Sequence, residues 1–280
     1  MKTIWQKNYS NTFFLFVIGF FSPIVNCENA EPTPNEQPVL NIFIHGTLIV
    51  QSHFKYLRKD AERKTGLLPA SSFKENSKRL KFAKALNATD PKKYPLNSFY
   101  FFNWSGRLSF AEREKSAEQL YNELIKLIKN CKANPIINIF THSHGGSVAL
   151  ELANIKNNQN LKINHLILMA CPVQESTKKL VHKEIFKKVT SLYSSDLLQI
   201  IDPQRIYKKN KAEKGKKIPW FSGRTFESNA KVYNVKVKIN GKDLKHRDFL
   251  YSPFINKLEN ILTQINTKTL SGKYDIEIKA

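Results

Sequence analysis

The sequence predicts an α/β fold, with a mostly parallel central sheet and helices on both of its faces. Short apolar runs typical of buried strands alternate with longer segments of helical periodicity, which is the pattern of repeated β–α–β units. The clearest unit is residues 136–150, where an apolar strand passes through a tight turn into a helix of small residues. A chain of 280 residues, 41% of them hydrophobic, can bury such a core in one domain.

The predicted strands share an apolar or aromatic run bounded by Gly, Pro or Asn; they are residues 39–44, 99–102, 166–170, 189–193 and 231–239, together with the strand that begins at Ile136. The predicted helices are residues 54–64, 74–86, 110–131, 178–188 and 254–265. Right-handed crossovers place the carboxyl ends of parallel strands at one edge of a sheet, and sites in such folds lie at that edge. Functional side chains are therefore expected directly after strands.

The N-terminal residues 1–27 are predicted to be a signal peptide. Lys2 and Lys7 precede an uncharged apolar run at residues 13–25, which is short for a bilayer span but matches the apolar region of a signal. A secreted or periplasmic location is expected. The alternatives are an uncleaved membrane anchor or lipidation of Cys27.

A polar, Pro-rich linker is predicted for residues 28–38, and the folded domain for residues 39–280. The chain carries 45 Lys and Arg against 23 Asp and Glu, a net charge of +22, with the densest basic run at residues 207–217. That run lacks interleaved aromatics and any helix-turn-helix or RNA-binding signature, so no specific nucleic-acid partner is expected. An anionic membrane surface and a plain solvated loop both remain open.

The turn after the strand that begins at Ile136 reads Thr-His-Ser-His-Gly-Gly, and its serine is Ser143. A strand, a sharp turn with one serine and a helix form the nucleophile elbow of serine hydrolases. The turn lifts the hydroxyl clear of the sheet, and the N–H groups at the helix start point to the same place. An upstream His45-Gly46 pair follows the first strand, where glycine permits a close backbone approach.

Two further polar residues follow predicted strands in the order Ser, Asp, His. Asp196 follows the strand at residues 189–193, and His246 follows the strand at residues 231–239. Asp202, six residues after Asp196, is the competing acid, but it lies farther from the strand end.

These features resemble the α/β-hydrolase superfamily, and within it the lipase- and esterase-like members with a His-Ser-x-Gly-Gly elbow. The resemblance spans residues 39–265. It implies that Ser143 is the nucleophile, that His246 is the general base and later the acid, and that Asp196 orients the imidazole.

The same resemblance implies that the backbone N–H groups of Thr47 and His144 bind the oxyanion. The family's elbow usually has glycine two residues before the serine, whereas this chain has Thr141. Because threonine is β-branched, a strained or slightly opened elbow is expected.

The implied activity is cleavage of a carboxylic ester, with a lipid or another lipophilic ester as the substrate, through an acyl-enzyme and without a cofactor. Two alternatives stay open. One is a protein that keeps the fold with little or no activity and binds anionic membranes or polymers, for which Thr141 and the positive charge argue. The other is an acyltransferase, which differs only in how the acyl-enzyme is resolved.

Four residues are expected to line the substrate pocket: His45, Trp104, Trp220 and Phe221. The last two lie in a basic insertion at about residues 200–230, which forms either part of a lid or a surface loop. No spacing typical of a metal site is found, so no metal is expected. Cys131 and Cys171 are expected to be buried thiols.

Overall fold

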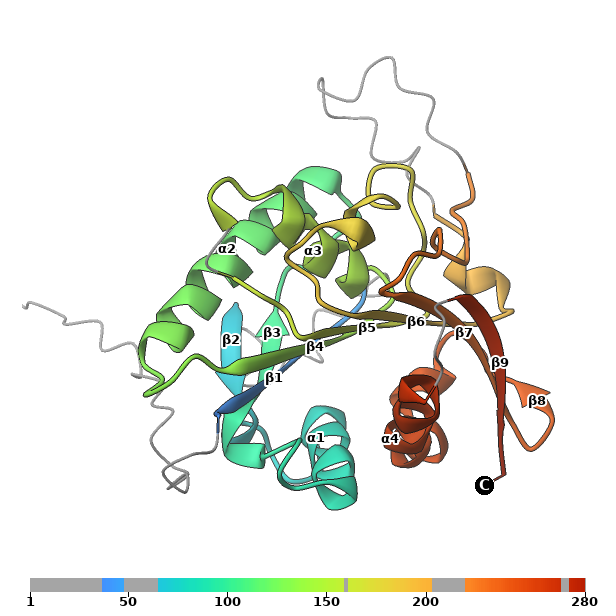
Figure 1. Ribbon diagram of the computed structural model, residues 1–280, viewed down its shortest axis with the longest axis horizontal. Helices are drawn as coiled ribbons and strands as arrows, with labels where there is room; N and C mark the ends of the chain where they lie inside the picture. The colour runs from blue at the N-terminus through green and yellow to red at the C-terminus, as the bar shows by residue number, and fades with distance from the viewer. Residues whose placement is uncertain (1–36, 48–64, 159–160, 203–219, 268–271, 280) are drawn as a thin grey trace, which may run out of the picture.

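The computed structural model describes residues 37–47, 65–158, 161–202, 220–267 and 272–279 (Figure 1). The predicted signal peptide, all but the last two residues of the predicted linker, the expected helix at residues 54–64 and the basic run at residues 207–217 lie outside these residues. The described elements are β1 (Val39–Ile44), β2 (Gly66–Pro69), α1 (Lys78–Thr89), β3 (Phe99–Asn103), α2 (Phe110–Lys129), β4 (Ile136–His142), α3 (Gly145–Glu151), β5 (His165–Met169), β6 (Val189–Tyr193), β7 (Val232–Ile239), β8 (Lys242–Asp243), α4 (Ser252–Asn266) and β9 (Gly272–Ile278).

The strands form one mixed, mostly parallel sheet, which confirms the predicted α/β class. Its order is β2-β3-β1-β4-β5-β6-β7, and both β8 and β9 pair with β7. β2 runs antiparallel to its neighbour β3, and β8 runs antiparallel to its neighbour β7. The other described pairs are parallel. The parallel strands β1, β4, β6 and β7 therefore end at a common edge.

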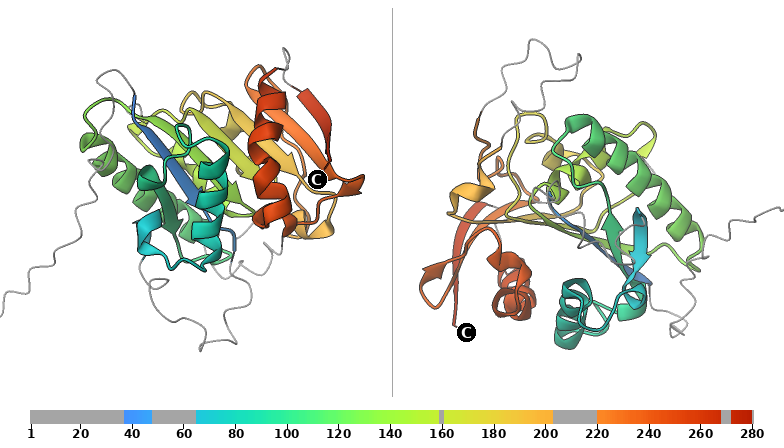
Figure 2. Two further views of the ribbon diagram at one scale, coloured as in Figure 1. Left: turned by 90° about the horizontal axis from the view of Figure 1, so that it is seen from below. Right: turned by 180° about the vertical axis from the view of Figure 1, so that it is seen from behind.

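Helices cover both faces of the sheet, as Figures 1 and 2 show, with α2 and α3 on one face and α1 and α4 on the other. Successive residues of a strand point to opposite faces of the sheet, so each strand contributes side chains to both cores. In β5, Leu166 and Leu168 belong to the core beneath α2 and α3, whereas Ile167 and Met169 belong to the core beneath α1 and α4. Burial on both faces explains why these strands are continuous apolar runs.

The two long helices carry clear start signals. Ser109 caps α2 by accepting a hydrogen bond from the Glu112 N–H at 3.4 Å, and Pro253 stands in the first turn of α4. No helix among the described residues combines the length and apolar character that a bilayer crossing requires.

The prediction of a helix at residues 178–188 is wrong. The structure has turns and a 3₁₀ turn, Leu180–His182, in its place. The backbone near Phe186 instead bridges to Ile163, with the Ile163 N–H donating to the Ile185 carbonyl at 2.7 Å. These contacts to the sheet edge satisfy backbone groups that a helix would have paired internally.

Three strands were not predicted: β2, β8 and β9. β2 has four residues, including Gly and Pro, and β8 has two, so neither carries a usable pattern. β9 does, because Tyr274, Ile276 and Ile278 alternate with charged residues, which is the period of a half-buried strand.

The two cysteines among the described residues, Cys131 and Cys171, differ in burial. Cys171 is fully buried, as predicted, and burial raises the pKa of its thiol to about 12, so it is unreactive at neutral pH. Cys131 is only partly buried, which corrects the expectation for that residue. Both are free thiols.

Candidate active site

Ser143 occupies a strained turn between β4 and α3. Its φ is 52°, a left-handed conformation that few residues other than glycine adopt. The Ser143 N–H donates to the Met169 carbonyl at 2.9 Å, and the Gly146 N–H donates to the Ser143 carbonyl at 3.0 Å. Backbone strain of this kind is stored at functional sites and held by the surrounding structure.

The loop after β1 passes directly over this serine. A Cβ atom added at Gly46 would lie 2.8 Å from Ser143 Cβ, and one added at Gly145 would lie 2.5 Å from the Ile44 carbonyl oxygen. Only glycine allows the backbones to approach so closely. The structure thus brings the loop containing Thr47 against the serine turn that contains His144.

Thr141 does not distort the turn. It lies in β4, pairs with Ile44 and Leu168, and its hydroxyl donates to the Ile167 carbonyl at 3.3 Å. Among the described residues it is not one of those with a positive φ. The elbow is strained, as expected, but the strain lies at Ser143, where the chain leaves the sheet, and not at Thr141.

Asp196 and His246 meet beyond the ends of β6 and β7. Asp196 Oδ2 accepts a hydrogen bond from the His246 backbone N–H at 3.1 Å. The Asp196 side chain also caps a 3₁₀ turn, accepting from the Leu198 N–H at 3.0 Å. Burial pushes the pKa of Asp196 up, but these bonds outweigh it and the net pKa is lowered, so the carboxylate is charged at neutral pH.

The His246 imidazole lies beside the serine turn without being bonded to the serine. Its ring centroid is 4.8 Å from that of His142, whose Nε2 bonds the His246 carbonyl at 2.8 Å. Its own Nδ1 is buried with no hydrogen-bond partner among the described residues. No hydrogen bond in the described part of the chain joins Ser143 Oγ to His246.

The imidazoles around Ser143 are held in the neutral form. Burial lowers the pKa of His45 to about 4 and that of His142 to about 3, and it lowers the pKa of His144 well below the usual value. Burial also lowers the pKa of His246, and the charge of Asp196 partly opposes this shift. A neutral imidazole at His246 is the form that can accept a proton.

The competing acid, Asp202, lies elsewhere. It is fully buried, its Oδ1 is 3.8 Å from His144 Nε2, and its Oδ2 accepts a hydrogen bond from Gln174 Nε2. The Gln174 Oε1 in turn accepts from the buried Arg113 guanidinium at 2.8 Å. Asp196 is thus the carboxylate that contacts His246, and Asp202 belongs to a buried chain of polar groups beneath His144.

Several residues that hold the site were not singled out from the sequence. Arg224 Nη1 donates to the carbonyls of Ser194 and Asp196, each at 2.7 Å, and Ser194 Oγ donates to the Leu244 carbonyl at 2.6 Å. The Arg224 bonds tie the loop after β6 to the segment before β7, and the Ser194 bond ties the same loop to the segment that precedes His246. Arg113 carried the clearest missed signal, because an arginine on the apolar face of a predicted helix needs a buried partner.

The four expected pocket residues divide into two pairs. Trp104 is buried in the core and its Nε1 donates to the His45 carbonyl at 2.8 Å, while the His45 ring stacks on it at 5.8 Å. Trp104 therefore fixes the loop over Ser143. Trp220 and Phe221 are 52% and 59% exposed, an unusual exposure for large aromatics. No group of side chains suited to a metal is found among the described residues.

Acidification is expected to destabilise the protein below about pH 6.5. The folded-state pKa values of His142 and His165 are about 3 and that of His45 is about 4, all through burial, so the unfolded chain binds protons first as pH falls. At pH 5.5 each histidine should lower the free energy of unfolding by roughly 1.4 kcal/mol, and the three together by roughly 4 kcal/mol. Urea titrations between pH 7.5 and 5.5 measure this.

In the variant His165→Gln, the loss of unfolding free energy between pH 7.5 and pH 5.5 should be smaller by the roughly 1.4 kcal/mol that one histidine contributes. An unfolding free energy that is constant from pH 7.5 to 5.5 contradicts the prediction.

No protein-family model matches this chain, and no curated protein matches it. Among solved structures, the chain is similar to one titled "Structure of a mycobacterium tuberculosis puromycin-hydrolyzing peptidase", with 11% identity and a TM-score of 0.31. The match covers 90% of this chain and 32% of that chain, so this chain spans about a third of that peptidase's length. We draw no functional conclusion from a likeness of this size.

Proposed function

We propose that this protein is a serine hydrolase of the α/β-hydrolase fold that cleaves carboxylic esters. The observation that carries the proposal is Ser143 at φ 52° on a strand–turn–helix elbow, with the His45-Gly46-Thr47 loop packed on it. A nucleophile elbow directs its serine hydroxyl away from the sheet toward a carbonyl substrate, and backbone N–H groups surround the place where the oxyanion forms. The sheet order, with an acid after β6 and a histidine after β7, supports the same proposal.

In the proposed reaction Ser143 Oγ attacks the ester carbonyl while His246 accepts its proton. The tetrahedral oxyanion is bound by the backbone N–H groups of Thr47 and His144, and His246 then protonates the leaving alcohol. Water activated by His246 hydrolyses the acyl-enzyme and regenerates Ser143. The chemistry requires no cofactor.

Asp196 is the residue we assign to orient His246. In the described structure its carboxylate contacts the backbone N–H of His246, and Nδ1 of that ring has no partner. A rotation of the imidazole during the reaction would bring Nδ1–H toward the same carboxylate, which would then stabilise the imidazolium. Hydrogen bonds of catalytic groups often tighten only once substrate is bound.

Labelling with a fluorophosphonate probe tests the proposal directly. Such a probe phosphonylates an activated serine, so the purified protein should be labelled and lose esterase activity in proportion. A well-folded protein that is neither labelled nor active on esters contradicts the proposal.

A lipophilic ester is the proposed substrate because an exposed apolar patch lies next to Asp196. We define the patch as Leu197, Leu198, Ile201, Trp220 and Phe221, which are 45–62% exposed. Ile201 bridges to Phe221, and the Ile201 N–H donates to the Leu197 carbonyl at 2.9 Å, so the patch is continuous. Contiguous exposed apolar side chains mark interaction surfaces. The patch and the chain's net charge of +22 together favour a lipid surface with anionic head groups.

The double variant Leu198→Asn/Phe221→Asn should lower activity on dispersed long-chain esters and binding to anionic phospholipid vesicles by about tenfold or more. The variant lacks two apolar side chains that would enter the lipid layer. Fully burying each of them would contribute roughly 1.5–3 kcal/mol to binding. Hydrolysis of a water-soluble short-chain ester should be unchanged and serves as the internal control. Equal losses on both substrates would show that the patch acts on the catalytic groups and not at a lipid surface.

The second candidate function is binding to an anionic surface without catalysis. The observation in its favour is the missing hydrogen bond between Ser143 and His246 among the described residues, together with the net charge. Such a protein would bind vesicles equally well with Ser143→Ala and would not be labelled by a fluorophosphonate. Transesterification with added alcohols would indicate an acyltransferase instead.

A further inference from the structure

A concave region lies at the edge of the sheet opposite the candidate active site, where the parallel strands begin. It is a cavity of about 540 Å³, within the roughly 300–1,000 Å³ typical of ligand pockets. Val39, Ile136 and His165, the first residues of β1, β4 and β5, line it, and Asn266 of α4 closes one side. β4 rises ~3.3 Å per residue, so the end of the cavity at Ile136 lies about 20 Å from Ser143.

The cavity combines an apolar floor with a cationic rim. Phe140 and Ile167 project into it from β4 and β5. Four lysines also line it, from two segments that are far apart in the sequence, residues 92–93 and 187–188. Asp90 is the one carboxylate among the lining residues, so positive charge is in excess there.

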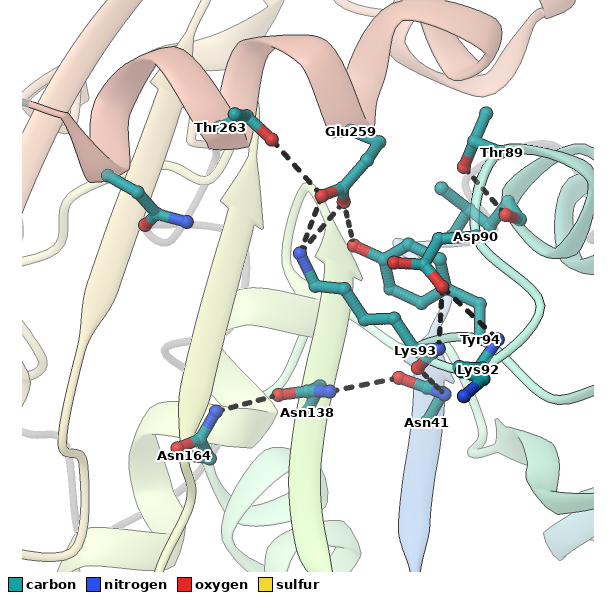
Figure 3. A network of polar contacts seen from close by, with 12 residues as sticks. Asn41, Thr89, Asp90, Lys92, Lys93, Tyr94, Asn138, Asn164, Glu259 and Thr263 are labelled. Atoms are coloured by element: carbon teal, nitrogen blue, oxygen red, sulfur yellow. Dashed lines mark hydrogen bonds and ion pairs between the residues drawn. The ribbon is translucent and has the colours of Figure 1, made fainter.

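One of these lysines is neutralised within the protein. Lys93 Nζ lies 2.7 and 2.9 Å from the two carboxylate oxygens of Glu259 on α4, and the Tyr94 hydroxyl donates to the same carboxylate (Figure 3). This ion pair joins the loop after α1 to α4. Glu259 is thereby fully engaged and does not compensate the other lysines.

Lys188 has no such partner. Its Nζ donates to the neutral Asn266 Oδ1 and lies 4.8 Å from the centroid of the Tyr233 ring. In the described part of the chain no carboxylate lies within ion-pair distance of it. Burial, and next the charge of Lys93, lower the pKa of Lys188, as expected of an ammonium group held near another without an anion between them.

A row of side-chain amides supplies neutral hydrogen-bond donors on the cavity wall. Asn164 Nδ2 donates to Asn138 Oδ1 at 3.2 Å, Asn138 Nδ2 donates to Asn41 Oδ1 at 3.1 Å, and Asn41 Nδ2 donates to the Lys93 carbonyl at 3.0 Å (Figure 3). Each amide nitrogen carries two N–H donors, and these bonds use one of them. Asn138 and Asn164 both line the cavity.

We propose that this cleft binds a small organic anion whose carboxylate or phosphate head group is carried on a short apolar body. The head group would lie among Lys187, Lys188 and the Asn138 and Asn164 amides, and the apolar body would lie on the floor around Phe140. Lysine and amide N–H groups are donors to anionic oxygens, and an anion between the lysines relieves their repulsion.

The test is an NMR titration of the full, isotope-labelled chain with hexanoate, hexyl phosphate and, as the neutral analogue, hexanol. Both anions should shift the methyl signals of Val39, Ile136 and Ile167, and hexanol should not. The anion that binds with the lower Kd identifies the preferred head group. Because the cleft is remote from the elbow, the Ser143→Ala protein should bind equally well, so the result is independent of the proposed hydrolase activity.

Two variants locate the binding site. Lys188→Gln should weaken anion binding by about tenfold or more, since it removes the half-buried cation. Lys187→Gln removes an exposed one and should weaken binding to a smaller extent while leaving the fold undisturbed. The matched control is Lys183→Gln, an exposed lysine outside the cleft, which should change nothing. Equal shifts with hexanol, shifts confined to residues near Ser143, or unchanged affinity in both Lys187→Gln and Lys188→Gln would overturn the proposal.

Discussion

Replacing Ser143 with alanine is expected to abolish both ester hydrolysis and fluorophosphonate labelling, with kcat falling by about 10⁶-fold. That is the order of loss when the nucleophile or the general base of a serine hydrolase is removed. His246→Ala should have a comparable effect, because without the imidazole the Ser143 hydroxyl has no acceptor for its proton. Steady-state kinetics and probe labelling measure the two losses separately.

The double variant Ser143→Ala/His246→Ala should be hardly worse than either single variant, since the two groups act as one unit. Ser252→Ala, an exposed serine at the start of α4, is the matched control and should retain full activity. Circular dichroism should show all of these variants to be folded. Activity that survives Ser143→Ala would exclude the proposed mechanism.

Replacing Arg113 with methionine is expected to lower the free energy of unfolding by about 3–5 kcal/mol, the cost of leaving one partner of a buried charged network unpaired. Arg113 is fully buried and bonds Gln174, which bonds the fully buried Asp202. Without the guanidinium, Gln174 Oε1 loses its donor, and the buried network that contains the Asp202 carboxylate loses a positive charge. For a domain of this size the midpoint of thermal unfolding should fall by roughly 10 °C.

The control for this variant is Arg107→Met, the same change at an exposed arginine close by in the sequence, which should alter stability by less than about 0.5 kcal/mol. Asp202→Asn should also be destabilising, and the double variant Arg113→Met/Asp202→Asn should cost less than the sum of the two. Strict additivity would show that the two side chains are not coupled. Asp196→Asn should by contrast reduce activity with little effect on stability, because Asp196 lies in a partly exposed loop.

The sequence was sufficient for the fold class and for most of the sheet. β1, β3, β4, β5, β6 and β7 coincide with predicted strands to within a residue or two, because strands buried on both faces are continuous apolar runs with sharp boundaries. The segment at residues 178–188 was misjudged because its apolar spacing fits a helix equally well. What prevented the helix was a backbone contact with Ile163, which no local pattern encodes.

For the candidate site too, some features could be predicted from the sequence and others depended on the tertiary structure. By itself the sequence determined that Ser143 lies on a strand–turn–helix segment followed by glycines, and that Asp196 and His246 come after strands, because these are properties of neighbouring residues. The tertiary structure alone decided which carboxylate meets which histidine. Asp196 and Asp202 are six residues apart, yet one contacts His246, 50 residues later in the sequence, and the other lies beneath His144 in a network anchored by Arg113. The place of Asp196 after a strand favoured it over Asp202, but the contacts themselves depend on how the loops fold back over the edge of the sheet, which the separate segments do not encode.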